Sequence, residues 1–144
     1  MSTPLSSPRR LVLAASALLF LAALPAPALL FTDHPPVRGI TTLAFGWWGV
    51  VLGDFPWFAN PLYFGALVLL WRGFNLAPAA LSALAIVVGL RTLGVDEWYH
   101  NEAGGTPVVG FGLAFWFWIA SFAVLLIGGL GLVRAKPSPA APSA

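Results

Sequence analysis

Residues 103–133 read AGGTPVVGFGLAFWFWIASFAVLLIGGLGLV, a run of 31 residues without a charged side chain. A helix needs about 20 predominantly apolar residues to cross the hydrocarbon core of a bilayer. This run is therefore long enough to span a membrane on its own. Three further uncharged runs, at residues 11–32, 55–71 and 73–90, are close to the length that a spanning helix needs. The sequence predicts an all-α integral membrane protein whose four transmembrane helices form a bundle.

The composition favours a membrane environment for most of the chain. Of the 144 residues, 59% are hydrophobic and 8% are charged, whereas an ordinary soluble domain has roughly 25% charged residues. The chain contains no cysteine, which excludes disulfides, iron–sulfur ligation and a lipidated cysteine. The net charge is only +2 and the basic residues cluster only at Arg9 and Arg10, so we expect no nucleic-acid binding.

Prolines, turns and charges divide the chain into segments. We expect a cytoplasmic tail over residues 1–10, a membrane domain over residues 11–134 and a second cytoplasmic tail over residues 135–144. Within the membrane domain, an interfacial helix over residues 40–52 precedes the second span, and an outer loop covers residues 94–109. The four spans are expected over residues 11–31, 55–71, 76–93 and 110–133.

The first span has two interpretations. Arg9 and Arg10 precede the apolar run LVLAASALLFLAAL, and an A-x-A pattern that ends at Ala28 follows it, which is the layout of a cleaved signal peptide. The apolar run continues through Phe31, which favours a span that is retained. Cleavage after Ala28 stays open at this point and would leave three spans.

The second span has a clear start signal. We expect Asn60 to be its N-cap residue and Pro61 its first helical residue, because asparagine and proline favour these positions. A broken helix that presents backbone groups to a transported substrate would give the same signal. Such helices come in pairs, and no counterpart of this segment appears in the chain, so an ordinary helix start is favoured.

The distribution of basic residues predicts the orientation. Cytoplasmic segments of membrane proteins carry more lysine and arginine than segments on the other side, which favours cytoplasmic positions for both termini. This orientation places Arg9, Arg10, Arg72, Arg134 and Lys136 inside, and it places Arg38, Arg91 and the acidic residues Asp33, Asp54, Asp96, Glu97 and Glu102 outside.

Aromatic residues are expected to concentrate on the outer side. Tryptophan is enriched at membrane interfaces, and a recognition surface would also gather aromatic side chains there. Arg91 either extends to the lipid headgroups or pairs with Asp54, which would tie the second span to the third. The residues expected to build this outer face or to hold its helices together are Trp47, Trp48, Asp54, Trp57, Asn60, Pro61, Arg91, Trp116 and Trp118.

The outer loops also carry imidazole and carboxylate groups, which are ligands of zinc and similar divalent ions. No segment shows a known ligand spacing, and a solvated loop accounts for the same residues, so we expect no metal site. The candidate ligands for the alternative are Asp33, His34, Asp96, Glu97, His100 and Glu102.

The predicted spans lack the groups that catalysis inside a membrane requires. Haem ligation needs histidine within the bundle, whereas His34 and His100 are both expected in loops. The spans also contain no nucleophile with a neighbouring base and no paired acids. We therefore expect no enzymatic activity and no cofactor.

Three short segments carry a resemblance to known proteins. They are GWWG at residues 46–49, FPWFANPL at residues 55–62 and FWIAS at residues 117–121. The pattern resembles small uncharacterised bacterial inner-membrane proteins, in which one span starts with a W-x-A-N-P-like segment and the last span contains a W-L-A-S-like one. The resemblance implies a multi-pass protein of the bacterial inner membrane and no particular activity.

These observations predict an accessory or interaction protein. Its outer face, built from residues 39–60 and 94–110, would contact membrane lipid or another membrane or periplasmic protein, and association between copies of the chain is open. One alternative is a small transporter or channel subunit that acts as an oligomer, because a single bundle with few polar interior groups cannot line a hydrated path. The other is an outer-facing module that binds a divalent metal ion.

Overall fold

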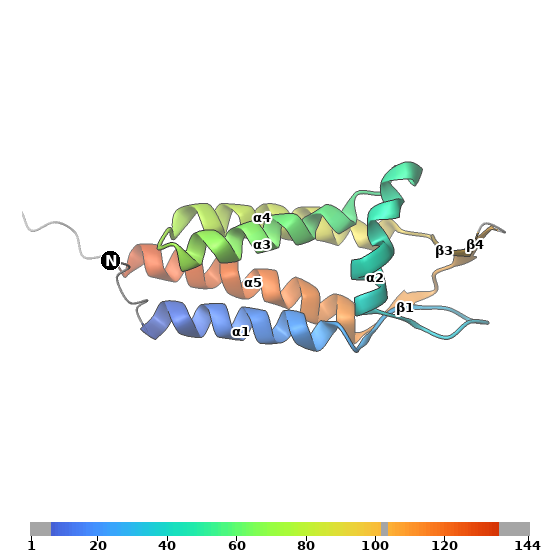
Figure 1. The fold of residues 1–144 in the computed structure, drawn as a ribbon, viewed down its shortest axis with the longest axis horizontal. Helices are drawn as coiled ribbons and strands as arrows, with labels where there is room; N and C mark the ends of the chain where they lie inside the picture. The colour runs from blue at the N-terminus through green and yellow to red at the C-terminus, as the bar shows by residue number, and fades with distance from the viewer. Residues whose placement is uncertain (1–6, 102–103, 136–144) are drawn as a thin grey trace, which may run out of the picture.

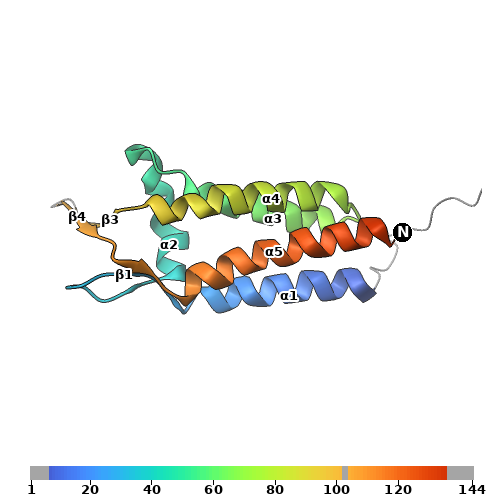
Figure 2. The same cartoon turned by 180° about the vertical axis from the view of Figure 1, so that it is seen from behind.

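The structure, a computed structural model, describes residues 7–101 and 104–135, without the side chains of residues 100 and 101. Four long helices run side by side along the molecule (Figures 1 and 2). They are α1 (Ser7–Ala23), α3 (Ala59–Trp71), α4 (Leu76–Leu90) and α5 (Leu113–Arg134). Helix α5 packs between α1 and α4, and α3 packs against α4. The predicted helical bundle is therefore present.

Aromatic rings fill the centre of the bundle. The ring of Phe20 in α1 stacks on that of Tyr63 in α3, with centroids 4.8 Å apart, and Tyr63 contacts Phe122 in α5 at 5.1 Å. Tyr63 and Phe122 are fully buried. Small residues of α4, such as Ala85, complete this core and let the helices approach one another closely.

The outward faces of the long helices are apolar. Large side chains such as Leu21, Val87 and Ile127 are exposed, with 58%, 63% and 70% of their surface accessible. Two helices among the described residues are long and apolar enough to cross a membrane: α5, and α4 together with the 3-10 helix η3 (Arg91–Gly94). Only 28% of the residues are buried in the most apolar window of α4 with η3, and 33% in that of α5, which is low for core helices of a soluble protein and supports a membrane environment.

The other two predicted spans are shorter than expected. Helix α1 has 17 residues and α3 has 13, so helix length supports the predicted spans 76–93 and 110–133 but not the other two. The first span was expected to continue to Phe31, but α1 ends at Ala23. Pro25 and Pro27 cause this early end, because proline lacks the backbone N–H that continues a helix.

The prediction of an all-α fold is wrong, because the chain also forms five short strands. A three-stranded sheet has the order β2 (Val37–Arg38), β1 (Pro27–Leu30) and β5 (Gly110–Phe111), and all its pairs are antiparallel. The expected outer loop over residues 94–109 instead contains a hairpin of β3 (Glu97–Asn101) and β4 (Gly104–Pro107). Strand pairing gives the backbone groups of these connections partners that no helix supplies.

A second helical segment crosses the end of the bundle. Helix α2 (Gly39–Phe45) is followed by the 3-10 helix η1 (Gly46–Leu52), and both lie across the ends of the long helices (Figure 1). The predicted helix over residues 40–52 is therefore confirmed as helical, but it changes type at Gly46. We call residues 24–58 and 91–112, which include this segment and the strands, the cap.

The expected start of the second span is also wrong in detail. The 3-10 helix η2 (Pro56–Phe58) continues directly into α3, whose N-cap residue is Phe58 rather than Asn60. Asn60 lies inside the first turn and is only 5% exposed. Its side-chain Nδ2 donates to the carbonyl oxygen of Trp57 at 2.9 Å, so the amide binds within the turn instead of capping it.

Charge separates the two ends of the molecule. Four of the six described arginines, Arg9, Arg10, Arg72 and Arg134, lie at the end opposite the cap, which we call the basic end (Figure 1), and Arg38 and Arg91 lie in the cap. The N-terminal tail was expected to reach residue 10, but α1 already begins at Ser7, and residues 1–6 and 136–144 lie outside the described residues. The described acidic residues all lie in the cap and are Asp33, Asp54, Asp96 and Glu97.

Candidate functional site

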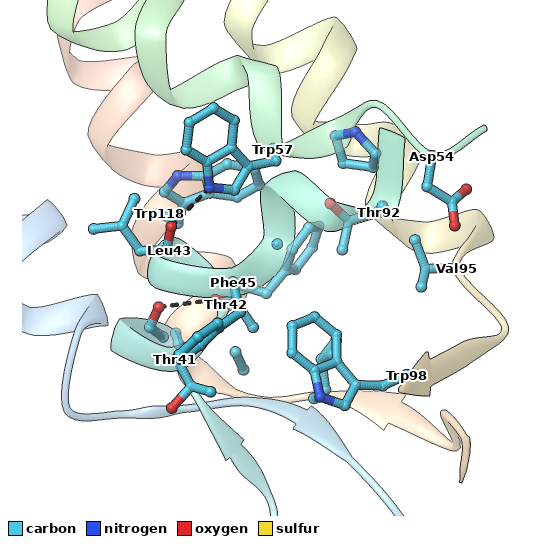
Figure 3. A pocket seen from close by; sticks show the side chains of 18 of the residues that line it. Thr41, Thr42, Leu43, Phe45, Asp54, Trp57, Thr92, Val95, Trp98 and Trp118 are labelled. Carbon is cyan, nitrogen blue, oxygen red and sulfur yellow. Dashed lines mark hydrogen bonds between the residues drawn. The ribbon is translucent and has the colours of Figure 1, made fainter. Parts of the chain in front are cut away.

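A large pocket lies in the cap, around α2 and η1 (Figure 3). Its volume is about 780 Å³. Its walls come from the C-terminal end of α1, the first turns of α3 and α5, and the segments η3 and β3. Most of the side chains that line it are apolar or aromatic. A concave apolar pocket with a few polar groups is the usual form of a small-molecule site.

Backbone hydrogen bonds hold α2 against the end of α1. The amide N–H groups of Gly39 and Ile40 donate to the carbonyl oxygens of Ala26 and Leu24, at 2.9 and 2.8 Å. These bonds satisfy carbonyls just beyond the end of α1, where no intrahelical donor is available. A Cβ atom on Gly39 would overlap the carbonyl oxygen of Ala23. Only glycine therefore allows this close approach, which sets one wall of the pocket.

Two tryptophans use their indole N–H groups to fix the floor of the pocket. Trp57 Nε1 donates to the carbonyl oxygen of Leu43 in α2 at 2.7 Å, a bond drawn in Figure 3. Trp118 Nε1 donates to Asn60 Oδ1 at 2.9 Å, which links α5 to α3. Because the polar edges of both rings are already bonded, the indoles offer mainly apolar surface to a ligand.

The rim of the pocket is acidic. Asp54, Glu97 and Tyr99 belong to its lining, and the Tyr99 hydroxyl donates to Glu97 Oε2 at 3.1 Å. This hydrogen bond, together with the negative charge of Glu97, raises the pKa of Tyr99 above its ordinary value. The charge of Asp54 acts in the same direction. The described lining contains these two carboxylates and no lysine, arginine or histidine.

A chain of buried hydroxyl groups runs from the pocket floor into the bundle. Ser121 Oγ donates to the carbonyl oxygen of Trp118 at 2.6 Å, and Ser16 Oγ donates to that of Ser121 at 2.8 Å. Since Ser16 has only one proton to donate, Tyr63 donates its hydroxyl proton to Ser16 Oγ, at 3.1 Å. All three side chains are fully buried, and they connect α1, α3 and α5.

The structure brings together only part of the predicted outer face. Trp48, Asp54, Trp57, Asn60 and Trp118 all line the pocket. The remaining predicted residues do not line it, and they are Trp47, Pro61, Arg91 and Trp116.

The residues outside the pocket have other surroundings. Trp47 contacts Trp48, with ring centroids 5.0 Å apart, and Trp116 lies exposed beside Phe115. Arg91 is exposed at the start of η3. Within the part of the chain that the structure describes, Arg91 forms no ion pair with Asp54, so the structure does not contain the alternative in which this pair ties the second span to the third.

Several further lining residues fall within the predicted outer face, residues 39–60 and 94–110, but were not singled out as site residues. Trp98 and Tyr99 reach the pocket because β3 folds back beside α2, and Figure 3 shows Trp98 directed toward that helix. Thr41 and Thr92 add hydroxyl groups. The adjacent aromatic pair Trp98-Tyr99 within an otherwise polar loop was the one available signal for these residues.

The candidate metal ligands are only partly placed. Asp33 and His34 lie with Thr106 in a smaller pocket of about 240 Å³, so the two predicted outer loops do meet. Among residues 7–101 and 104–135, no three histidine, cysteine, aspartate or glutamate side chains are grouped to hold a metal ion. Glu102 and the side chain of His100 lie outside the described residues, so the metal-binding alternative stays a prediction.

Comparisons with protein-family models, with curated proteins and with solved structures find no match to the chain. The resemblance to small bacterial inner-membrane proteins therefore stays a prediction. The chemistry of the site must be argued from its own residues.

Two hydroxyl groups among the lining residues are already bonded within the protein. An activated nucleophile needs a base within hydrogen-bond distance and a group that orients the base. The hydroxyl of Thr42 donates to the carbonyl oxygen of Gly39 at 2.8 Å, and that of Tyr99 donates to Glu97. Both hydroxyl groups therefore donate their protons to oxygen atoms of the protein. The apolar walls offer a large surface to a hydrocarbon chain.

Proposed function

We propose that this protein is a multi-pass protein of the bacterial inner membrane, with four spanning helices and both termini in the cytoplasm. The cap then faces outward, and its pocket binds the apolar chain of a lipid or of a lipid-like amphiphile. The role is that of a non-enzymatic accessory protein. The pocket of about 780 Å³, placed where a spanning bundle would meet the membrane interface, is the observation that carries this proposal.

The distribution of charge and apolar surface supports the orientation. Four arginines lie at the basic end and two, Arg38 and Arg91, lie in the cap, and the positive-inside rule expects such an excess on the cytoplasmic side. Between the two ends, the outward side chains are apolar. The shorter helices α1 and α3 fit this arrangement if the bilayer thins locally beside them, which costs fractions of a kcal/mol per Å, and η2 extends α3 toward the cap.

The pocket lining supports an apolar ligand. Pockets for small molecules are typically about 300–1,000 Å³ in volume, and this pocket falls within that range. Aromatic side chains of the lining, including Trp48 and Trp98, occupy the level at which tryptophan usually meets lipid. A chain that enters the pocket from the membrane would therefore move from one apolar environment to another without exposing its surface to water.

Pocket-filling variants test this proposal. Mass spectrometry of the intact protein, purified in a neutral detergent, is expected to detect a retained lipid or amphiphile. Thr41→Phe places a ring in the pocket and should abolish retention, because Thr41 lines it. Ala44→Phe adds the same ring to an exposed position of α2 outside the lining and should leave retention unchanged. A wild-type protein without any retained molecule, or equal retention in both variants, would contradict the proposal.

A further inference from the structure

The pocket has two chemically different parts. Its deep part is formed by the indoles of Trp57 and Trp118, whose N–H groups are bonded within the protein. Its rim is formed by Asp54, Glu97 and Tyr99, beside the side chain of Thr92. A ligand that matches both parts must be amphiphilic, with an apolar chain and a polar head.

The negative charge of the rim determines which polar head group the pocket can bind. Two carboxylates line the pocket, and the described lining offers no basic side chain to balance them. The nearest arginine in the sequence, Arg91, is exposed and does not belong to the lining. An anionic head would bring a third negative charge to this rim, and juxtaposed like charges are strongly unfavourable in a binding site.

The aromatic side chains that line the pocket favour a cation as well. Trp98 and Tyr99 of β3 and Trp48 of η1 line the same pocket as the two carboxylates. The face of an aromatic ring attracts ammonium groups within about 6 Å, and tryptophan attracts them most strongly. Carboxylates combined with aromatic faces are the chemistry that recognises primary amine and quaternary ammonium groups.

We propose that the pocket binds an amphiphile with a positively charged amine or ammonium head, which lies at Asp54 and Glu97, while its apolar chain occupies the space between α2 and the floor. This inference rests on the proposed function, because it requires the pocket to hold an apolar chain. It adds the chemical class of the head. Such an ammonium group occurs in free long-chain ammonium compounds and, next to a phosphate, in zwitterionic membrane lipids such as phosphatidylethanolamine; phosphatidylglycerol carries the same phosphate without the ammonium group.

A competition experiment tests the choice of head. The full chain, delipidated in a neutral maltoside detergent, is incubated with equal amounts of phosphatidylethanolamine and phosphatidylglycerol that carry the same acyl chains. Mass spectrometry of the intact complex then counts each bound lipid. We expect the amine-bearing lipid to be favoured about tenfold, because hydrogen bonds to charged groups are the stronger ones in binding sites. Equal binding of the two lipids would overturn the inference while leaving chain binding intact, and binding of neither would overturn the proposed function too.

Matched variants locate the preference. Asp54→Asn combined with Glu97→Gln should remove the preference for the amine-bearing lipid, and Asp54→Asn alone should reduce it. Asp96→Asn is the control, since it removes the same charge from a neighbouring residue that does not line the pocket. A loss of preference in Asp96→Asn as large as in the double variant would overturn the inference. Circular dichroism verifies that each variant retains its helices.

A final pair of probes identifies the source of the head. Decyltrimethylammonium and decyl sulfate share the same chain length and differ in the sign of the head. Displacement of bound phosphatidylethanolamine by the cation indicates a site that also accepts free ammonium amphiphiles, and its absence indicates a site restricted to the lipid. Both of these results fit the inference. More effective displacement by decyl sulfate than by the cation would contradict it.

Discussion

The two ends of the helical bundle are built in opposite ways. At the basic end, the Arg9 guanidinium donates to the carbonyl oxygen of Gly73 at 3.2 Å and to Asn75 Oδ1 at 3.0 Å. Asn75 Nδ2 in turn donates to the carbonyl oxygen of Leu132 at 3.4 Å, so three helices are tied together. At the cap end, a long connection between α1 and α3 holds the helices apart around a pocket of about 780 Å³.

The difference shows where the molecule has room for a ligand. At the basic end the connection between α3 and α4 is short, and Gly73 completes its turn with a φ of +98°, which glycine adopts at no steric cost. At the cap end, polar residues such as Asp54 and Glu97 belong to the lining of a pocket. The basic end ties the helices together, and we propose that the cap end carries the function.

A side chain added at the contact between α2 and α1 is expected to have the largest effect on stability. Gly39→Ala places a methyl group on the carbonyl oxygen of Ala23, a backbone atom that cannot move aside. Overpacking of this kind costs about 1–3 kcal/mol, and we expect the upper end of that range. Gly94→Ala is the control, since no atom lies within 4 Å of its new Cβ. Unfolding in mixed micelles, followed by circular dichroism, measures both; equal stability of the two variants would contradict the described docking of α2.

The buried hydroxyl chain predicts an order of effects inside the bundle. Ser16→Ala leaves the buried Tyr63 hydroxyl without its partner, which costs roughly 1–3 kcal/mol. Tyr63→Phe removes that hydroxyl and leaves the bond from Ser16 to Ser121 intact, so it should cost only about 0.6 kcal/mol, the average for hydrogen bonds between membrane helices. The same unfolding measurement compares them. A larger loss in Tyr63→Phe than in Ser16→Ala would show that the donors are assigned wrongly.

The basic end predicts a smaller effect that leaves binding unchanged. Arg9→Gln removes the bonds to Gly73 and Asn75 and should lower the free energy of unfolding by about 1 kcal/mol, since the guanidinium is only partly buried. Arg10→Gln changes an exposed neighbour in the same turn and serves as the control. Retained lipid, counted by mass spectrometry, should be the same in both variants. Loss of the lipid in Arg9→Gln alone would contradict the proposal that the basic end contributes to stability and not to binding.

The smallest expected effect is the titration of Tyr99. The folded protein holds the phenolic proton more tightly, because the hydroxyl donates to Glu97 and the carboxylate opposes a phenolate. The contribution to stability is therefore fully present below pH about 10 and is lost as the pH rises through the higher pKa of the folded state. In a Tyr63→Phe background Tyr99 is the only remaining tyrosine, so its absorbance reports this pKa alone. Glu97→Gln should lower the pKa of Tyr99. An unchanged pKa would contradict the contact between Glu97 and the Tyr99 hydroxyl.

The bundle was largely predictable from the sequence because its signal is local. Each long helix takes most of its residues from an uncharged run, and α4 and α5 begin within a few residues of their predicted starts. The start of α3 was misplaced because η2 adds a turn before Asn60, and a 3-10 helix has no distinctive sequence signal.

The cap was less predictable because its contacts are not local. Leu29 pairs with Phe111, and Gly39 binds the carbonyl oxygen of Ala26 through a turn that the sequence does not specify. The site shows the same limit. Trp57 and Trp118 were identified as outer aromatic residues, whereas Trp98 entered the pocket only through the pairing of β3 with β4.

Accessibility of single cysteines tests the central claim most directly, because the chain contains no cysteine of its own. Gly94→Cys places a thiol in the cap, where nothing crowds it, and Ala135→Cys places one at the basic end. In intact bacterial cells whose outer membrane has been made permeable, a membrane-impermeant maleimide is expected to label Gly94→Cys. Ala135→Cys should react only after the inner membrane is disrupted. Labelling of both positions in intact cells, or of Ala135→Cys alone, would contradict a spanning bundle with an outward-facing cap.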